Sequence, residues 1–322
     1  MKKHKIWQLI VIDLLCIGVG LNLFALFHHV LPGKQKMEPV NLIEGHDIVP
    51  PSEEKTDIQP SDDPVPEEEE TGSGQPLTWR EKFEGKFTEG EVLSTDSTYM
   101  SENINITVSH VEENGVIYSV ADIYLTDLQY LRSGFSKDEY HKGQEMITET
   151  ASRVGAIVAV SGDHYGARQE GAVLRNGVLY RDSEYDDVCV IGLDGVMTTY
   201  TNEEFDIEAV KEKGAWQIWT FGPELLDDGN VKTKFNSSVT RANPRAAIGY
   251  VEPGHYYFVQ VDGRIKESKG MTMEELSTLF HDLGCVSAYN LDGGQSAGFV
   301  WKGQLMSYPY NRPGWDIIYI GE

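Results

Sequence analysis

Apolar and polar residues alternate in short runs along the chain after residue 103, which is the period-two pattern of half-buried β-strands. Residues 104–108 and 116–125 form two such runs, and the intervening Asn114 and Gly115 favour a tight hairpin turn. Two more hairpins are expected where Asn-Gly or Asp-Gly pairs separate apolar runs, over residues 173–180 and 188–200. Single strands are expected at residues 156–160, 215–221, 246–250, 256–261, 286–291 and 315–320.

Three segments between these strands are predicted to be helical. Two of them cover residues 139–154 and 203–213. Thr272 and Glu275 form the capping box of the third helix, which Gly284 ends at the expected left-handed position. Because hairpins outnumber helices, the pattern predicts an α+β fold with a mixed, largely antiparallel β-sheet core and covering helices.

The N-terminus has a different pattern. Lysines at positions 2, 3 and 5 precede the mostly apolar residues 6–31, a stretch long enough to cross ~30 Å of hydrocarbon with some tilt. Lysines before this stretch and acidic residues after it favour an N-terminus in the cytoplasm. We therefore expect residues 1–33 to form a cytoplasmic stub and a single-pass transmembrane helix, with the bulk of the chain outside the cell membrane. A secretory signal peptide is the alternative, although no small-x-small cleavage site is evident.

Residues 34–76 are rich in Pro, Glu, Asp, Ser and Gly and include four consecutive glutamates at 67–70. The segment contains too few apolar residues for their burial to offset the entropy lost on ordering. We therefore predict a disordered, acidic, Pro-rich linker. No second linker and no internal repeat follow. Residues 77–322 are therefore expected to form one domain, with its core at 103–322.

Charge and cysteine content narrow the possible functions. The formal net charge of -24 argues against a nucleic-acid partner, which normally needs a basic face. Cys189 and Cys285 either form one bridge or are two small buried residues, and the second interpretation is preferred. No cofactor is indicated, because the chain lacks a His-x-His or Asp-x-Asp ligand pair. A divalent cation such as Ca²⁺ is compatible with the aspartates, but no motif calls for one.

Three predicted strands end in an aspartate next to a glycine, at Asp163, Asp262 and Asp292. If these ends meet, one cleft holds three carboxylates together with His164, Arg245, Arg264 and Asn290. Carboxylates stabilise cationic carbon or activate water, and guanidinium groups bind phosphate, so this set suits hydrolysis of a sugar or phosphate ester. Asp next to Gly is also an ordinary turn signal, which gives each aspartate a structural alternative.

A set of short motifs occurs in a fixed order along residues 103–322. They are Val120 to Tyr124, Ser161 to Tyr165, Phe221 to Leu226, Asn243 to Gly249, Val261 to Arg264, Tyr289 to Ser296, and Arg312 with Asp316. Together these motifs resemble the phosphodiester glycosidase family. The resemblance implies a hydrolase that cleaves an α-linked sugar 1-phosphodiester between the anomeric carbon and the phosphate.

The resemblance also implies roles for individual residues. Arg245 and Arg264 would hold the phosphate, while catalysis would fall to Asp163, Asp262 or Asp292, which would stabilise the sugar carbon or activate water. The other residues expected to bind substrate are His164, Asn290, Gly293, Gly294, Ser296 and Arg312, and no residue is expected to bind a metal. The outward-facing anchor suggests a glycan substrate in the cell envelope, such as a glycopolymer or an exopolysaccharide.

Two other functions fit parts of the pattern. Clustered aspartates also bind Mg²⁺ or Ca²⁺, as in a metal-dependent phosphodiesterase, which would release the sugar still phosphorylated. A non-catalytic envelope protein that binds polysaccharide on an inherited enzyme fold is the other alternative. The presence of all three aspartates and both arginines argues against it.

Overall fold

The computed structural model describes residues 17–19, 37–44 and 77–322. The chain divides into two compact units, Met1–Glu38 and Pro39–Glu322. Of the predicted transmembrane segment, three helical residues, 17–19, are described, and the remainder lies outside the described residues. Within the described ranges, no helix has the length and apolar character needed to span a bilayer.

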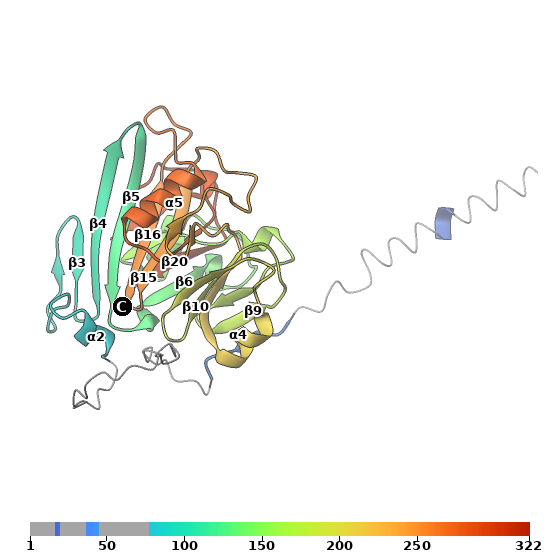
Figure 1. The fold of residues 1–322 in the computed structure, drawn as a ribbon, viewed down its shortest axis with the longest axis horizontal. Coiled ribbons are helices and arrows are strands. Elements are labelled where there is room, and N and C mark those ends of the chain that lie inside the picture. Colours follow the sequence, from blue (N-terminus) through green and yellow to red (C-terminus); the bar gives the residue numbers. More distant parts are fainter. Residues whose placement is uncertain (1–16, 20–36, 45–76) are drawn as a thin grey trace, which may run out of the picture. The chain divides into compact units, whose positions relative to one another are not determined.

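Seven strands form the largest sheet of the second unit (Figure 1). The hairpin predicted around Asn114 is confirmed, and the strands predicted at 246–250 and 256–261 pair with each other. In spatial order the strands are β17 (Ser287–Asn290), β15 (Arg245–Glu252), β16 (His255–Val261), β5 (Val116–Leu125), β4 (Ile104–Glu113), β3 (Thr98–Met100) and β2 (Leu93–Ser94).

Two further sheets and a small ribbon complete the strands. The six-stranded sheet contains β1 (Val40–Asn41), β9 (Val178–Arg181), β8 (Val173–Arg175), β12 (Ala215–Trp219), β10 (Val188–Gly192) and β11 (Met197–Tyr200). The five-stranded sheet contains β19 (Gln304–Leu305), β18 (Phe299–Trp301), β7 (Val158–Ser161), β20 (Asp316–Ile320) and β6 (Leu131–Phe135). The ribbon pairs β13 (Leu226–Asp227) with β14 (Asn230–Val231).

The pairing of these strands confirms the predicted α+β fold and corrects one detail of it. Every strand pair recorded in the described residues is antiparallel. The parallel pairs that a mixed sheet would contain are not found among them. The core is also divided over three sheets, in which hairpin pairs such as β4–β5 and β15–β16 lie beside neighbours that are distant in the sequence.

The helices are short and lie on the sheets. They are α2 (Trp79–Lys82), α3 (Ile147–Arg153), α4 (Ile207–Lys213) and α5 (Met273–Asp282), with single 3₁₀ turns η2 (Leu128–Tyr130), η3 (Ser136–Asp138), η4 (Tyr165–Ala167) and η5 (Gly294–Ser296). The capping box of α5 is confirmed, since Thr272 and Glu275 each accept the other's backbone N–H. The helix predicted from residue 139 begins only at Ile147, because His141 and Gly143 have positive φ, which an α-helix does not allow.

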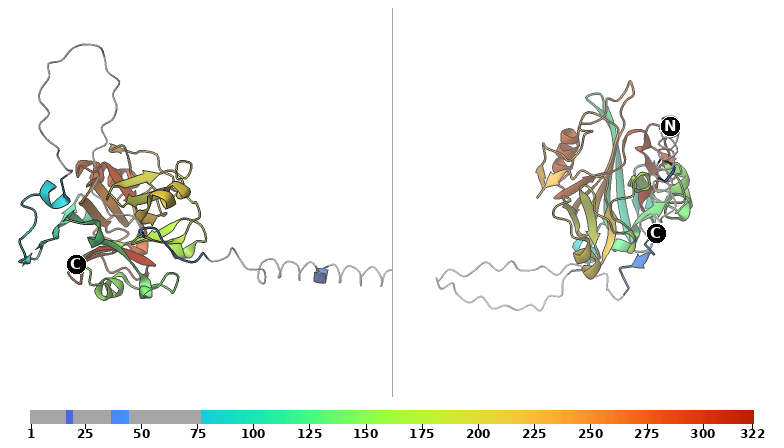
Figure 2. Two further views of the ribbon diagram at one scale, coloured as in Figure 1. Left: turned by 90° about the horizontal axis from the view of Figure 1, so that it is seen from below. Right: turned by 90° about the vertical axis from the view of Figure 1, so that its right-hand side faces the viewer.

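The seven-stranded sheet is buried on both faces. On one face Ile123 and Phe258 belong to a core shared with the other two sheets, which includes Trp219 of β12. On the other face α5 packs through Leu276 and Phe280, both fully buried. Figure 2 (right) shows this arrangement, with α5 in orange on one side of the long β4–β5 hairpin and the green region around residues 130–175 on the other.

The start of the predicted linker has structure of its own. Val40 and Asn41 pair with β9, and Leu42 is buried with its N–H donated to the Gly177 carbonyl at 2.8 Å. Asn41 accepts the N–H of Ile43 through its side chain, which turns the chain away from the sheet edge. Composition alone does not predict this contact, because three apolar residues in an acidic segment are too weak a signal. Residues 45–76 of the linker lie outside the described residues.

Gly249 of β15 provides a test of the packing under α5. A Cβ atom at this position would lie 2.5 Å from Cδ1 of Phe280 and 2.8 Å from Sγ of Cys285. We expect Gly249→Ala to lower the free energy of unfolding by about 1–3 kcal/mol through overpacking, measured by urea denaturation. Phe280→Leu should lower the free energy of unfolding by less in the Gly249→Ala background than in the wild type, because the smaller side chain makes room for the added methyl group. Additive losses would contradict the packing described here.

Candidate active site

Antiparallel pairing brings the start of β15 against the ends of two neighbouring strands. Arg245 is in register with Val261 of β16, and Ala247 with Asn290 of β17. The residues just before β15 and just after β16 and β17 therefore lie together. They surround a cleft of about 470 Å³, whose lining includes seven predicted site residues: Arg245, Arg264, Asn290, Asp292, Gly293, Gly294 and Arg312.

Asp292 lines this cleft directly after β17. Its N–H donates to the Gly162 carbonyl at 2.9 Å, which joins the end of β17 to the end of β7. Arg312 Nη2 donates to Asp292 Oδ1 at 2.7 Å, and His164 Nδ1 lies 3.2 Å from Oδ2. The carboxylate is only 6% exposed, so these two partners fix its orientation. His164 therefore contacts Asp292, but it is not among the residues that line the cleft.

Gly293 and Gly294 allow the chain to turn tightly after Asp292. A Cβ atom on Gly293 would lie 2.6 Å from the Pro244 carbonyl oxygen, so only glycine fits without a shift of the backbone. Gly294 has a φ of +61° and donates its N–H to the same carbonyl at 2.9 Å. The N–H of Gly294 is therefore engaged within the protein.

Arg245 and Arg264 face the cleft without a carboxylate partner. Arg245 is 3% exposed, and its guanidinium donates to three backbone carbonyls, those of Met271 (3.1 Å), Val239 (2.9 Å) and Arg241 (2.6 Å). Burial, followed by the charge of Arg264, lowers the pKa of Arg245 to about 10, which leaves it charged at neutral pH.

Arg264 is held from one side only. Its Nε and Nη2 both donate to Asn243 Oδ1, at 3.0 and 2.6 Å. Among the described residues neither Arg264 nor Arg245 forms an ion pair with an acidic side chain. Two guanidinium groups close to each other, one of them buried, are stabilised by an anion, and phosphate matches their donor geometry.

Asn290 adds a neutral acceptor to this cleft. Its Nδ2 donates to the Gly222 carbonyl at 2.7 Å, which fixes the orientation of the amide. Its Oδ1 is buried and has no hydrogen-bond partner. An unpaired buried acceptor therefore belongs to a residue that lines the cleft.

Asp163, predicted to be catalytic, lies in a buried ion network and not in the cleft. Its side chain is fully buried and accepts hydrogen bonds from Thr220 N (3.0 Å), Arg168 Nη2 (3.3 Å) and Arg175 Nη2 (3.4 Å). Asp316 completes the network, accepting from Arg175 Nε at 2.7 Å and from Asp163 N at 2.6 Å. This environment gives Asp163 a structural role in the described structure.

The pKa values of Asp316 and Arg175 are shifted in this network. Burial raises the pKa of Asp316 to about 6; Arg175 opposes this shift and the nearby Asp163 carboxylate adds to it. Burial acts to lower the pKa of Arg175, but Asp316 and Asp163 outweigh it and raise the pKa overall. The guanidinium therefore stays charged between the carboxylates of Asp163 and Asp316.

Asp262 is also turned away from the cleft. Its two carboxylate oxygens accept the N–H of Tyr308 at 2.9 and 3.1 Å, and Oδ1 also accepts from Gln260 Nε2 at 2.8 Å. Burial raises the pKa of this carboxyl. The three strand ends thus approach one another as expected, but their aspartate side chains point to different surroundings, and Asp292 alone of the three lines the cleft.

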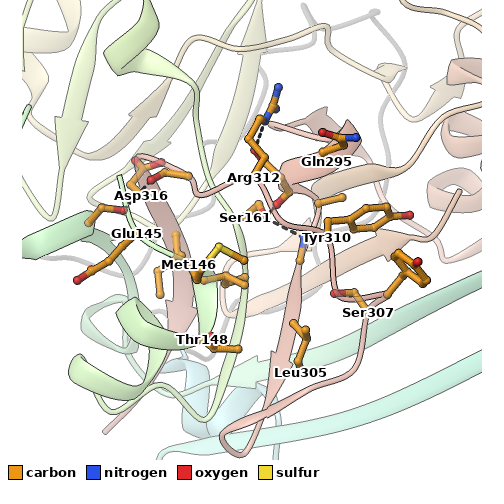
Figure 3. A pocket seen from close by; sticks show the side chains of 18 residues that line it. Glu145, Met146, Thr148, Ser161, Gln295, Leu305, Ser307, Tyr310, Arg312 and Asp316 are labelled. Carbon is orange, nitrogen blue, oxygen red and sulfur yellow. Dashed lines mark hydrogen bonds between the residues drawn. The ribbon is translucent and has the colours of Figure 1, made fainter. Parts of the chain in front are cut away.

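Ser296 and Arg312 connect the cleft with a small cavity behind it. Arg312 Nε donates to Ser296 Oγ at 2.5 Å, so Ser296 holds the arginine and does not itself line the cleft. The cavity has a volume of about 40 Å³, room for a few water molecules, and is lined by several hydroxyl groups. Figure 3 shows Arg312, Ser161 and Tyr310 around it, with Asp316 and Glu145 on the opposite side.

Several cleft residues were not predicted from the sequence. Asn243 positions Arg264, and residues 236–239 form one wall of the cleft beside Phe221 and Asp186. Asn243 lies in a motif that the sequence singled out, so its amide next to an arginine was a usable signal. The segment at 236–239 has no periodicity, and nothing in its residues distinguishes it from an ordinary loop.

Metal-ligating and cysteine residues were also checked. In residues 77–322 and the shorter described segments, no group of three or more His, Cys, Asp or Glu side chains is arranged to hold a metal ion. Cys189 and Cys285 are both free and buried, which confirms the interpretation as small buried residues. Burial raises the pKa of both thiols.

The chain is thus an α+β protein with a cleft at antiparallel strand ends, in which two guanidinium groups without acidic partners lie beside a hydrogen-bonded carboxylate. Residues 154–319, slightly more than half of the chain, match the family model described as phosphodiester glycosidase. The chain belongs to the phosphodiester glycosidase family. The matched range includes all of the residues that were predicted to act at the site.

Similar proteins come from bacteria and vertebrates. The chain is 39% identical over 178 residues to the N-acetylglucosamine-1-phosphodiester alpha-N-acetylglucosaminidase of Bos taurus, covering 55% of this chain and 31% of the relative. It is 32% identical over 176 residues to the SPbeta prophage-derived uncharacterized protein YomE of Bacillus subtilis, covering 51% and 27%. The chain thus spans less than a third of the length of these two relatives.

One solved structure shares the fold of this chain. It is the catalytic domain of the zebrafish N-acetylglucosamine-1-phosphodiester alpha-N-acetylglucosaminidase, auto-inhibited by its pro-peptide. The TM-score is 0.56, over 68% of this chain and 83% of that one. At 20% sequence identity the likeness shows a shared fold.

The buried ion network yields a prediction about stability. Asp316→Ala leaves the buried Arg175 with one of its two acidic partners, Asp163. We expect this variant to lower the free energy of unfolding by about 3–5 kcal/mol. Lys142→Ala removes an exposed pair with Glu139 and should leave the denaturation curve unchanged. Urea denaturation of both variants checks this. Equal midpoints for the two would contradict a central role for the network.

Proposed function

We propose that this protein hydrolyses a glycosyl phosphodiester, breaking the bond between the anomeric carbon and the phosphate oxygen. One observation carries the proposal: Arg245 and Arg264 face the cleft without acidic partners, beside the oriented carboxylate of Asp292. Membership of the phosphodiester glycosidase family supports it. The names of the vertebrate relatives, which specify N-acetylglucosamine-1-phosphodiester cleavage, agree with the same bond.

In this proposal the two arginines bind the phosphate group. Their charges are in place before the substrate arrives, since backbone carbonyls hold Arg245 and Asn243 holds Arg264. As the C1–O bond breaks, negative charge grows on the departing phosphate monoester, and fixed guanidinium groups stabilise it without reorganisation. A phosphate monoester is already a good leaving group, so a strong general acid is less necessary than in ordinary glycosidases.

Asp292 is the carboxylate that would act at the sugar. Its position at the cleft wall, held by Arg312 and His164, allows it to stabilise positive charge on the anomeric carbon or to activate a water molecule. These two roles predict different stereochemistry of the released sugar. Asn290 Oδ1 would accept a hydrogen bond from a hydroxyl or amide of the sugar.

We also propose that the protein works outside the cell, anchored by residues 6–31, on a glycopolymer of the envelope or an exopolysaccharide. The support is the sequence pattern at the N-terminus, a basic start followed by a long apolar stretch. An extracytoplasmic location would place the cleft among glycans with phosphodiester links.

Hydrolysis of UDP-N-acetylglucosamine, a soluble sugar phosphodiester, tests the proposed activity. We expect the protein to release free N-acetylglucosamine, and Asp292→Asn and Arg245→Gln each to lower kcat/KM by about 10²–10³-fold. Arg80→Gln, which changes an exposed arginine on α2, is the control and should retain full activity. Equal rates in all four proteins would refute the assignment. Release of sugar phosphate in place of free sugar would instead indicate a phosphodiesterase.

Cell fractionation tests the proposed anchor. The full chain should sediment with membranes, and a variant lacking residues 1–33 should be recovered in the soluble fraction. Protease added outside intact cells or spheroplasts should degrade the domain if it faces outward. Protection of the domain until the membrane is permeabilised would reverse the proposed orientation.

A further inference from the structure

The β19–β20 loop, residues 306–315, carries Arg312 to the cleft without belonging to any sheet except for one bridge at Gly314. Pro309 and Pro313 lack an N–H, so a continuous ladder of backbone hydrogen bonds is impossible here. The side chain of Arg312 is 43% exposed, and burial therefore does little to fix it. What holds this loop decides where the guanidinium of Arg312 lies.

At the ends of the loop, the N–H of Met306 donates to the Phe299 carbonyl and the Trp315 carbonyl accepts the N–H of Ser136, both at 2.9 Å. Between these ends the loop is attached at every second residue from 308 to 314. The N–H of Tyr308 donates to both oxygens of Asp262, and the hydroxyl of Tyr310 bonds the N–H and the carbonyl of Gly263 at 2.8 and 2.7 Å. Arg312 N donates to the Gln295 carbonyl at 3.3 Å. Gly314 N donates to the Glu145 carbonyl at 2.9 Å.

Two of these attachments come from the end of β16, at Asp262 and Gly263. Asp262 is itself fixed by three hydrogen bonds. Gln260 donates to the Asp262 carboxylate, and the Asp262 N–H donates to the Ile117 carbonyl. Ser268 Oγ donates to the backbone carbonyl of Asp262 at 2.5 Å. A rigid carboxylate that receives the Tyr308 N–H sets the start of the loop. Arg312, four residues further on, then reaches Asp292 and Ser296.

We infer that Asp262 is a positioning residue: by holding the β19–β20 loop it keeps the guanidinium of Arg312 against Asp292, and it does not touch the substrate. The inference rests on the proposed function for its kinetic consequence, because Arg312 matters only if Asp292 does the chemistry. Its structural part, the attachment of the loop to Asp262, is independent of the reaction.

Hydrogen–deuterium exchange tests the structural part in the full chain. We expect Asp262→Ala to speed exchange in peptides covering 306–315 and to leave those of β4 and β5 unchanged. Asp194→Ala is the matched control, since Asp194 Oδ1 accepts the Val196 N–H at 3.0 Å in a distant hairpin turn. It should leave exchange at 306–315 as in the wild type. Unchanged exchange at 306–315 in Asp262→Ala would overturn the inference whether or not the protein hydrolyses anything.

A double-mutant cycle on sugar release tests the kinetic part. We expect Asp262→Ala to lower kcat/KM about tenfold in the wild type, because a displaced Arg312 disorients Asp292, and by less than about twofold in the Arg312→Ala background. Asp262→Asn keeps an oxygen for the Tyr308 N–H and should lose less than Asp262→Ala. Two results would overturn the inference in favour of a direct role for Asp262. One is that the kcat/KM losses of Asp262→Ala and Arg312→Ala multiply in the double variant. The other is that Asp262→Asn lowers kcat/KM as much as Asp292→Asn does. If the wild-type protein has no activity, the proposed function is refuted. The exchange experiment alone then decides whether Asp262 positions the β19–β20 loop.

Discussion

The charge of Arg175 is the constraint on which the arrangement of this domain depends. A guanidinium with 1% of its side chain exposed needs its charge compensated, and Asp163 and Asp316 do this from two other parts of the chain. Arg175 ends β8 of the six-stranded sheet, while Asp163 follows β7 and Asp316 starts β20 of the five-stranded sheet. Two sheets are therefore joined by charge as well as by apolar packing.

This junction extends to the cleft through the backbone. Gly162 precedes Asp163 in the network and accepts the N–H of Asp292, so the end of β7 is shared by the buried ions and the candidate active site. A Cβ atom on Gly162 would lie 2.3 Å from Asp316 Oδ1, so there is no room for a side chain between them. The position of the catalytic candidate thus depends on residues that do not line the cleft.

The sequence predicted this fold better than it predicted the directions of side chains. Alternating apolar residues and Asn-Gly turns are local signals, and the hairpins around Asn114 and Asn176 appear where expected. An aspartate beside a glycine at a strand end marks a turn, but its rotamer depends on distant partners. Asp163 turns toward Arg175, and Asp262 toward the N–H of Tyr308. Neither contact has a signature within the few residues that make up each turn.

The arginines were predictable for the converse reason. An arginine that opens a buried strand needs compensation, and Arg245 receives it from three carbonyls of the chain around it. Carbonyl oxygens carry only partial charge, so most of the positive charge remains for a ligand. Asn243-Pro244 keeps this part of the chain outside the sheet and close to Gly293 and Gly294. The sequence therefore located the arginines of the cleft from local signals, whereas the directions of the aspartates depend on partners far away in the chain.

The unpaired Oδ1 of Asn290 gives the cleft a means of selection. This oxygen lacks both solvent and a hydrogen bond in the free protein, which costs about 1–3 kcal/mol before any ligand binds. A ligand that brings a donor to the oxygen would recover that cost, whereas a ligand that brings an apolar group or another acceptor would recover nothing. Discrimination at this wall would therefore come from the stabilisation gained by well-matched ligands.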